Sequence, residues 1–304
     1  MTLQLRGHIT LPPHGSGGFD HGDVHAATGR VFVAHTANNT VDVIDGERLE
    51  FVRGVGGCPE GSGVLCMQDA DALVFAAARG AGKVLVLDAT SCVVRNEIAV
   101  GPKPNGLAWD KSRRHLLVAD VDDFSARLLE APGGTTIAST PLPGRPRWCV
   151  FDRARDRFLV NIREPACVVA LAGGTAEIVA TIDVSVAGPH GLDLDAGADR
   201  AFVACDAGSL IVLDLTRDQE TGSVPIDGEP DAIWFNALRN VVYVAIGKPG
   251  LIDVVDCRGG LSVAERVTTE EGAHTTAFDA ERQRLYVFLP GSSRAAVYEE
   301  VQSR

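Results

Sequence analysis

Histidine and aspartate recur in this sequence at corresponding points of a repeated segment. His21, His190, Asp231 and His274 belong to one series of positions spaced by multiples of about 42 residues. Imidazole and carboxylate groups together suit a borderline divalent metal ion such as zinc, manganese or iron, with positions left open for water or substrate. Such an ion could acidify bound water or polarise a carbonyl group. We therefore predict a divalent metal at these four residues, with Asp231 as a ligand or general base.

Arginine is concentrated in a different part of the same repeat series. Arg145, Arg147 and Arg163 all belong to the fourth repeat, and Arg79 belongs to the second. The planar guanidinium group suits carboxylate or phosphate, so we expect Arg147 to hold an anionic group of a small-molecule ligand. The alternative is that these arginines simply pair with acidic residues of neighbouring loops, namely Asp122, Asp123 and Glu164.

A repeated sequence motif places these residues at equivalent positions of successive repeats. Its clearest copy runs from Pro189 to Ala204, and the equivalent positions of the seven copies differ by 42, 42, 42, 43, 41 and 43 residues. A fixed period of this length is typical of propellers and solenoids. The equivalent positions, in chain order, are His21, Gly63, Asn105, Arg147, His190, Asp231 and His274.

Each repeat contains four short segments with the character of β-strands. In the third repeat the first two are 106–109 and 116–119, and the alternating third segment is clearest at 40–45 and 210–214. Short β-branched runs separated by Gly, Pro and Asp favour an all-β fold, and no long stretch shows helical periodicity. Four strands in each of seven repeats predict a seven-bladed β-propeller.

The two ends of the sequence complement one another. The last repeat has no fourth strand of its own, whereas residues 3–11 form a spare apolar strand before the first repeat. We expect this N-terminal strand to become the outer strand of the last blade, which closes the ring and removes an exposed sheet edge. Residues 1–304 are accordingly predicted to form a single propeller domain.

Closure of the ring would make neighbours of residues far apart in sequence. The fifth, sixth, seventh and first repeats become contiguous, so their His, Asp, His and His form an arc at one mouth of the central channel. His25 and His35 are expected close to this arc. Cys205 stands in its repeat where His35 stands in the first, and it is either a soft ligand of the arc or a plain buried thiol. The alternative interpretation is a merely polar channel mouth, in which these side chains bond to loop backbone.

The repeats resemble those of the YVTN-repeat, YncE-like family of seven-bladed propellers. The resemblance covers almost the whole chain and lies in the Pro-x-Gly-hydrophobic pattern at 189–192, in the Val-Ala ending at 203–204 and in 41–45. The fourth repeat departs from it, with Trp148 where glycine is usual. This resemblance implies the propeller fold, and among the activities of the broad class it suggests ester or lactone hydrolysis.

The composition of the chain excludes some classes of binding partner. A net charge of −12 argues against nucleic acid and against an anionic membrane surface. The N-terminal residues lack the features of a signal peptide, so a cytoplasmic location is expected. The seven cysteines are odd in number and contain no CxxC pair, which favours buried free thiols.

Two functional hypotheses follow. The first is a small-molecule site at the channel mouth, built on the metal-binding arc and extending to metal-dependent hydrolysis of an ester or lactone. The second is a non-catalytic scaffold that binds a protein partner through its outer loops. The oligomeric state is not determined by the sequence.

Overall fold

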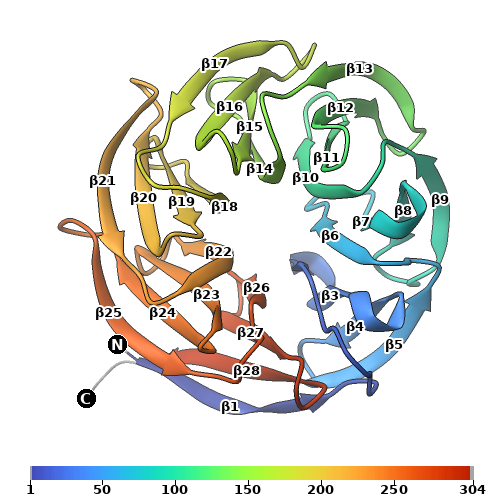
Figure 1. Ribbon diagram of the computed structural model, residues 1–304. Coiled ribbons are helices and arrows are strands. Elements are labelled where there is room, and N and C mark those ends of the chain that lie inside the picture. Colours follow the sequence, from blue (N-terminus) through green and yellow to red (C-terminus); the bar gives the residue numbers. More distant parts are fainter. Residues whose placement is uncertain (1, 302–304) are drawn as a thin grey trace.

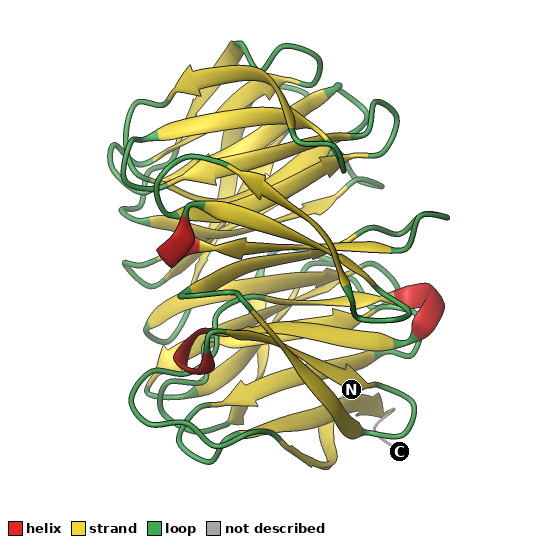
Figure 2. Cartoon of the chain, turned by 90° about the vertical axis from the view of Figure 1, so that its right-hand side faces the viewer, coloured by secondary structure: helices red, strands yellow, loops and turns green. Residues whose placement is uncertain are grey.

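The computed structural model describes residues 2–301. Within that range the chain forms seven four-stranded antiparallel sheets, here called blades, arranged in a ring around a central channel (Figure 1). Seen from the side, the strands run between loops on two opposite faces (Figure 2). The predicted all-β, seven-bladed propeller is therefore confirmed.

Each of the first six blades uses four consecutive strands, numbered from the channel outward. Their bounds are β2 (Gly22–His25), β3 (Arg30–His35), β4 (Thr40–Asp45), β5 (Glu50–Gly56); β6 (Gly61–Cys66), β7 (Leu73–Ala78), β8 (Lys83–Asp88), β9 (Val94–Ala99); β10 (Pro104–Asp110), β11 (His115–Asp120), β12 (Ser125–Glu130), β13 (Thr135–Pro141); β14 (Pro146–Asp152), β15 (Arg157–Ile162), β16 (Cys167–Ala172), β17 (Ile178–Asp183); β18 (Pro189–Asp195), β19 (Arg200–Cys205), β20 (Ser209–Asp214), β21 (Gln219–Pro225); β22 (Glu229–Asn236), β23 (Val241–Lys248), β24 (Leu251–Asp256) and β25 (Ser262–Thr268). Helical structure in residues 2–301 is limited to the 3-10 turns η1 (Ala26–Thr28), η2 (Thr36–Asn38) and η3 (Arg79–Ala81), and none is long and apolar enough to cross a membrane.

The seventh blade is assembled from both ends of the chain. It contains β26 (Thr275–Asp279), β27 (Arg284–Leu289), β28 (Arg294–Val301) and, as its outer strand, β1 (Thr2–Thr10). Strand β1 lies antiparallel to β28, from Thr2 opposite Val301 to Thr10 opposite Arg294 (Figure 1). The predicted closure by the N-terminal strand is confirmed, because β1 supplies the outer strand that the C-terminal repeat lacks.

The apolar core lies between the blades. Strand side chains alternate between the two faces of a sheet, and each of the seven buried clusters combines residues of two adjacent blades. Val43 of the first blade and Val74 of the second share one cluster, for example. Adjacent blades therefore hold one another in place around the whole ring, as the hydrophobic effect requires of sheets that are apolar on both faces.

Glycine permits the closest approach between blades at the channel. A Cβ atom on Gly106 would overlap the carbonyl oxygen of Arg147, and one on Gly191 would overlap that of Asp231. Gly63 has the same relation to Asn105. The next blade presents a backbone carbonyl at each of these points, so only glycine fits the third position of the repeated Pro-x-Gly motif.

Truncation of Ile9 should test the closing strand. Ile9 is 2% exposed in the cluster between the last and first blades, whereas Leu5 on the same strand is 48% exposed. Replacing a buried Ile with Ala costs about 2–5 kcal/mol, so I9A should lower the free energy of unfolding in urea by that amount. The matched L5A variant should change it by less than about 0.5 kcal/mol, and equal effects of the two substitutions would contradict the assigned burial.

Candidate functional site at the channel mouth

The predicted arc of imidazoles converges on one carboxylate. His274 Nδ1 lies 2.7 Å from Asp231 Oδ2, and His190 Nε2 lies 3.1 Å from Asp231 Oδ1. His21 Nε2 is 3.7 Å from the same Oδ1 atom. Asp231 and His190 stand near the start of β22 and β18, whereas His21 and His274 immediately precede β2 and β26. Residues from four blades therefore meet at one mouth of the channel.

Each of the three imidazoles is oriented by a carboxylate at its Nδ1 atom. Asp231 holds His274, Asp20 lies 2.5 Å from His21 Nδ1, and Asp206 lies 2.8 Å from His190 Nδ1. Sequence reasoning missed Asp20 and Asp206. A second period would have found Asp206, because it follows the second strand of its blade at the point where Arg79 and Arg163 follow theirs.

The charges of the cluster reinforce one another. Burial favours the neutral form of Asp231, but the charge of His190 together with the hydrogen bond and charge of His274 holds the pKa of Asp231 well below its ordinary value. Burial also disfavours a charged His274, yet its hydrogen bond to Asp231 and that carboxylate's charge raise the pKa of His274 to about 9. His274 is therefore a cation at neutral pH, at a side chain that is 37% exposed.

Two of the arginines are paired, though with partners other than those considered from sequence. Arg163 Nε lies 2.7 Å from Asp206 Oδ2, and Arg79 Nη2 lies 2.9 Å from Asp20 Oδ2. The alternative of pairing with Asp122, Asp123 or Glu164 is not the arrangement seen for Arg163. Asp122 lies 3.6 Å from Lys103 instead, and Asp123 lies 3.2 Å from Arg127.

Arg147 differs from Arg79 and Arg163 because its charge is not paired. Its Nε atom is buried without a hydrogen-bond partner, and among residues 2–301 its guanidinium forms no ion pair. Burial lowers the pKa of Arg147, and the nearby charges of Arg145 and Arg163 act in the same direction against the attraction of Asp231. A buried unsatisfied donor of this kind is costly, so this guanidinium is available to an incoming acceptor.

Trp148 explains the departure of the fourth repeat from the glycine pattern. Its ring stacks on the imidazole of His21, with centroids 3.9 Å apart and planes at 4°. His21 belongs to the first blade and Trp148 to the fourth, so this contact reaches across the channel. Face-to-face packing of the two rings also restricts the orientation of His21.

A pocket of about 470 Å³ opens beside this cluster. Its charged lining includes Arg147, Arg163, Lys248 and His274 together with the carboxylates of Asp206, Asp231, Glu229 and Glu271. The pocket therefore presents basic groups from the fourth, sixth and seventh blades to a common space, next to the imidazole–carboxylate cluster.

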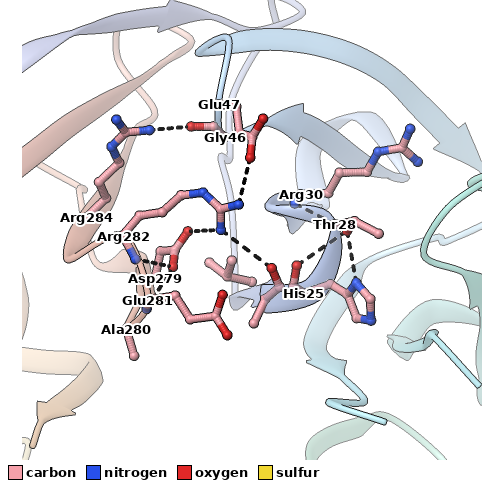
Figure 3. A network of polar contacts seen from close by, with 12 residues as sticks. His25, Thr28, Arg30, Gly46, Glu47, Asp279, Ala280, Glu281, Arg282 and Arg284 are labelled. Atoms are coloured by element: carbon pink, nitrogen blue, oxygen red, sulfur yellow. Dashed lines mark hydrogen bonds and ion pairs between the residues drawn. The ribbon is translucent and has the colours of Figure 1, made fainter. Parts of the chain in front are cut away.

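Three residues expected near the arc do not join it. His35 is fully buried inside the first blade, where it lies 2.7 Å from Asp42 and 2.8 Å from His14. His25 lies at the other end of β2, where its Nδ1 atom contacts Thr28 (Figure 3). Cys205 is a buried thiol, and burial raises its pKa to about 12. The expectation that His25 and His35 lie close to the arc was therefore wrong, because β2 carries His25 to the opposite face and His35 is enclosed. For Cys205 the plain buried thiol is the alternative that the structure has.

Within the part of the chain that the structure describes, no group of three or more His, Cys, Asp or Glu side chains is arranged so that it could hold a metal ion. The histidines instead use their Nδ1 atoms to contact carboxylates. Asp231 Oδ1 is buried and faces the Nε2 atoms of His190 and His21, but neither of them forms a hydrogen bond to it.

These features define a seven-bladed β-propeller with a charged site at one mouth of its channel. No family model matches the sequence, and no curated protein matches it either. Among solved structures, hydrazine synthase of Kuenenia stuttgartiensis is similar over 99% of this chain and 100% of that chain, with a TM-score of 0.84 and 12% identity. A chain of a mitotic checkpoint complex is similar over 98% of this chain and 92% of its own, with a TM-score of 0.83 and 10% identity. At such identities the similarity shows the fold alone.

The pairing of His274 with Asp231 should be visible in its titration. With the pKa of His274 raised from 6.5 to about 9, the pair stabilises the folded state fully below pH 6.5, and this contribution is lost as the pH rises through 9. In D231N the pKa of His274, measured from its imidazole C–H signals by NMR, should fall toward 6.5 and this part of the pH dependence of unfolding should disappear. D256N, which alters a half-buried carboxylate paired with Arg258 and remote from His274 in the sequence, should leave both unchanged. An unshifted His274 in D231N would contradict the assignment.

Proposed function

We propose that this protein binds a small anionic molecule, carrying a carboxylate or phosphate group, in the pocket at the channel mouth. The observation that supports this most directly is the half-buried Arg147 side chain, whose buried Nε atom has no partner among the described residues. His274, charged through Asp231, lines the same pocket as Arg147. An anion entering this space would satisfy Arg147 without displacing an existing ion pair.

The chemistry of the pocket favours a ligand with several acceptor atoms. Guanidinium groups bind carboxylate and phosphate through two parallel hydrogen bonds. Lys248 adds a flexible ammonium group at the rim. Glu229 and Glu271 line the same pocket, and they would disfavour anions that do not reach the basic groups. Because the whole chain carries a charge of −12, attraction of the anion must come from this local arrangement rather than from the overall field.

Removal of the Arg147 charge should abolish most of this binding. Calorimetric titration with inorganic phosphate, citrate and malonate should show saturable binding of at least one of them to the wild-type protein. Loss of a charged hydrogen bond is worth about 1.5–3 kcal/mol, so R147Q should weaken that binding by roughly 10-fold to 150-fold.

The matched control is R258Q, which alters an exposed arginine paired with Asp256. It should bind the same anion as tightly as the wild type does. Equal affinity of wild type and R147Q, or the absence of saturable binding of all three anions, would rule out the proposed site.

A metal-dependent function is the second candidate, and the convergence of two Nε2 atoms on Asp231 Oδ1 without a hydrogen bond favours it. The Nε2 atoms of His190 and His21 lie 3.1 and 3.7 Å from that oxygen, while their Nδ1 atoms contact Asp206 and Asp20. Carboxylates on the Nδ1 atoms are the usual outer partners of metal-bound histidines. A divalent metal would therefore be held by His21, His190 and Asp231, with His274 orienting Asp231 from its other oxygen.

When bound, such an ion would acidify water or polarise a carbonyl group. The resemblance to YVTN-repeat propellers suggests ester or lactone hydrolysis as the reaction. The residues themselves would contribute positioning: Arg147 would hold an anionic part of the substrate, Asp231 would serve as ligand or general base, and Trp148 would fix the His21 ring by stacking.

Elemental analysis of protein purified without an affinity tag tests this second candidate. We expect about one equivalent of zinc, manganese or iron in the wild type, because three protein ligands suffice for such a site. H190A should lose the metal. The control H115A alters a histidine of the third blade that contacts the backbone of Gly173 in the fourth, and it should retain the metal. No metal, together with no change in melting temperature on adding these ions, would remove the candidate.

The non-catalytic scaffold remains the alternative. One similar solved structure is of a mitotic checkpoint complex, and a propeller that uses its outer loops for a protein partner would need neither Arg147 nor the histidines. Failure of both the anion and the metal experiments would favour that function.

A further inference from the structure

A second cavity lies inside the channel, apart from the mouth pocket. It measures about 230 Å³, and all three tryptophans of the chain, Trp109, Trp148 and Trp234, line it. It shares Leu65, Trp234 and two aspartates with a larger pocket of about 560 Å³. Asp279, Ala280 and Glu281 also line that larger pocket. They lie at the end of β26 remote from His274, so the pocket reaches the face opposite the mouth site.

The two shared aspartates, Asp23 and Asp193, come from the first and fifth blades. Asp23 is 9% exposed and accepts hydrogen bonds of 2.7 Å from the backbone N–H groups of Val24 and Cys66. Asp193 accepts bonds of 2.7 and 2.6 Å from Leu194 and Phe235. In both cases one donor belongs to the next blade, so the backbone fixes the position of each carboxylate.

Neither carboxylate has a cation beside it. Among residues 2–301, no Lys, Arg or His forms an ion pair with Asp23 or Asp193, although most other buried aspartates of the chain have such a partner. Burial raises the pKa of Asp23 to about 7, with a further contribution from the charge of Asp193, and burial raises that of Asp193 to about 6. A buried negative charge that no protein cation compensates is costly, and a bound cation would remove that cost.

The walls of the cavity supply an independent reason to expect an organic cation. Tryptophan faces attract ammonium and alkylammonium groups through the cation–π interaction, most strongly where water is excluded. Leu107, Val150, Phe151 and Ile233 add apolar surface. A hydrated metal ion would make little use of these aromatic and apolar walls.

We propose that this channel cavity binds a small organic cation, an ammonium group carried on an apolar or aromatic body. The ammonium group lies between Asp23 and Asp193, and the apolar body packs against Trp109 and Trp234. The ligand enters from the face opposite the mouth site. The two sites are therefore distinct in position and take ligands of opposite charge.

Intrinsic fluorescence provides a direct measurement, because every tryptophan of the chain lines the cavity. The wild-type protein is titrated at pH 8 with phenethylamine, with its neutral analogue 2-phenylethanol and with the anionic 3-phenylpropanoate. We expect a saturable change in tryptophan emission with the amine, at least 10-fold weaker binding of the alcohol, and no binding of the carboxylate at the same site.

Charge removal at one aspartate separates a cation site from a merely apolar cavity. D193N keeps an oxygen that can accept the Phe235 N–H bond and should weaken amine binding at least 10-fold while leaving binding of 2-phenylethanol unchanged. D122N, which alters an exposed carboxylate near Lys103, should behave as the wild type. If D193N does not fold, as judged by circular dichroism, D23N is tested in the same way.

The result is separable from the mouth site. R147Q should retain amine binding in full, and D193N should retain whatever anion binding the wild type shows. Equal binding of amine and alcohol, unchanged amine affinity in both D193N and D23N, or the absence of a saturable fluorescence change would overturn the proposal.

Discussion

The pairing of the first strand with the last holds the molecule in its circular form. Strand β1 joins β28 along eight residue pairs, and the hydroxyl of Thr275 in the last blade donates to the carbonyl of Phe19, just before the first blade. Closure brings His274 and His21 into the same cluster around Asp231. Without these contacts β28 would have an unpaired edge, and the mouth site would be divided between two ends of the chain.

The fold and the composition of the mouth could be predicted because both depend on a period. Equivalent residues of successive blades reach the same level of the channel, and the close approach at Gly106 and Gly191 keeps neighbouring blades at that level. The spacing of His21, His190, Asp231 and His274 was therefore sufficient to bring them together. Asp206 could have been found in the same way from the loops that follow the second strands.

The contacts of individual side chains could not be predicted. The repeat period indicates how deep in the channel a residue lies, but it does not indicate which side chain that residue contacts. Arg163 pairs with Asp206, whereas Arg147, from the same blade, has no ion-pair partner in residues 2–301. His35 stands at a strand end like other site residues, yet Asp42 and His14 enclose it. Asp23 is unremarkable in the sequence, and only the structure shows that no cation accompanies it.

The stacking of His21 on Trp148 links the charged mouth to the interior of the channel. The His21 ring comes from the first blade and the Trp148 ring from the fourth, so the pair spans the channel. Trp148 also lines the tryptophan-lined cavity. One indole therefore belongs to both sites, and a change in its position would alter the surroundings of His21 and the shape of that cavity together.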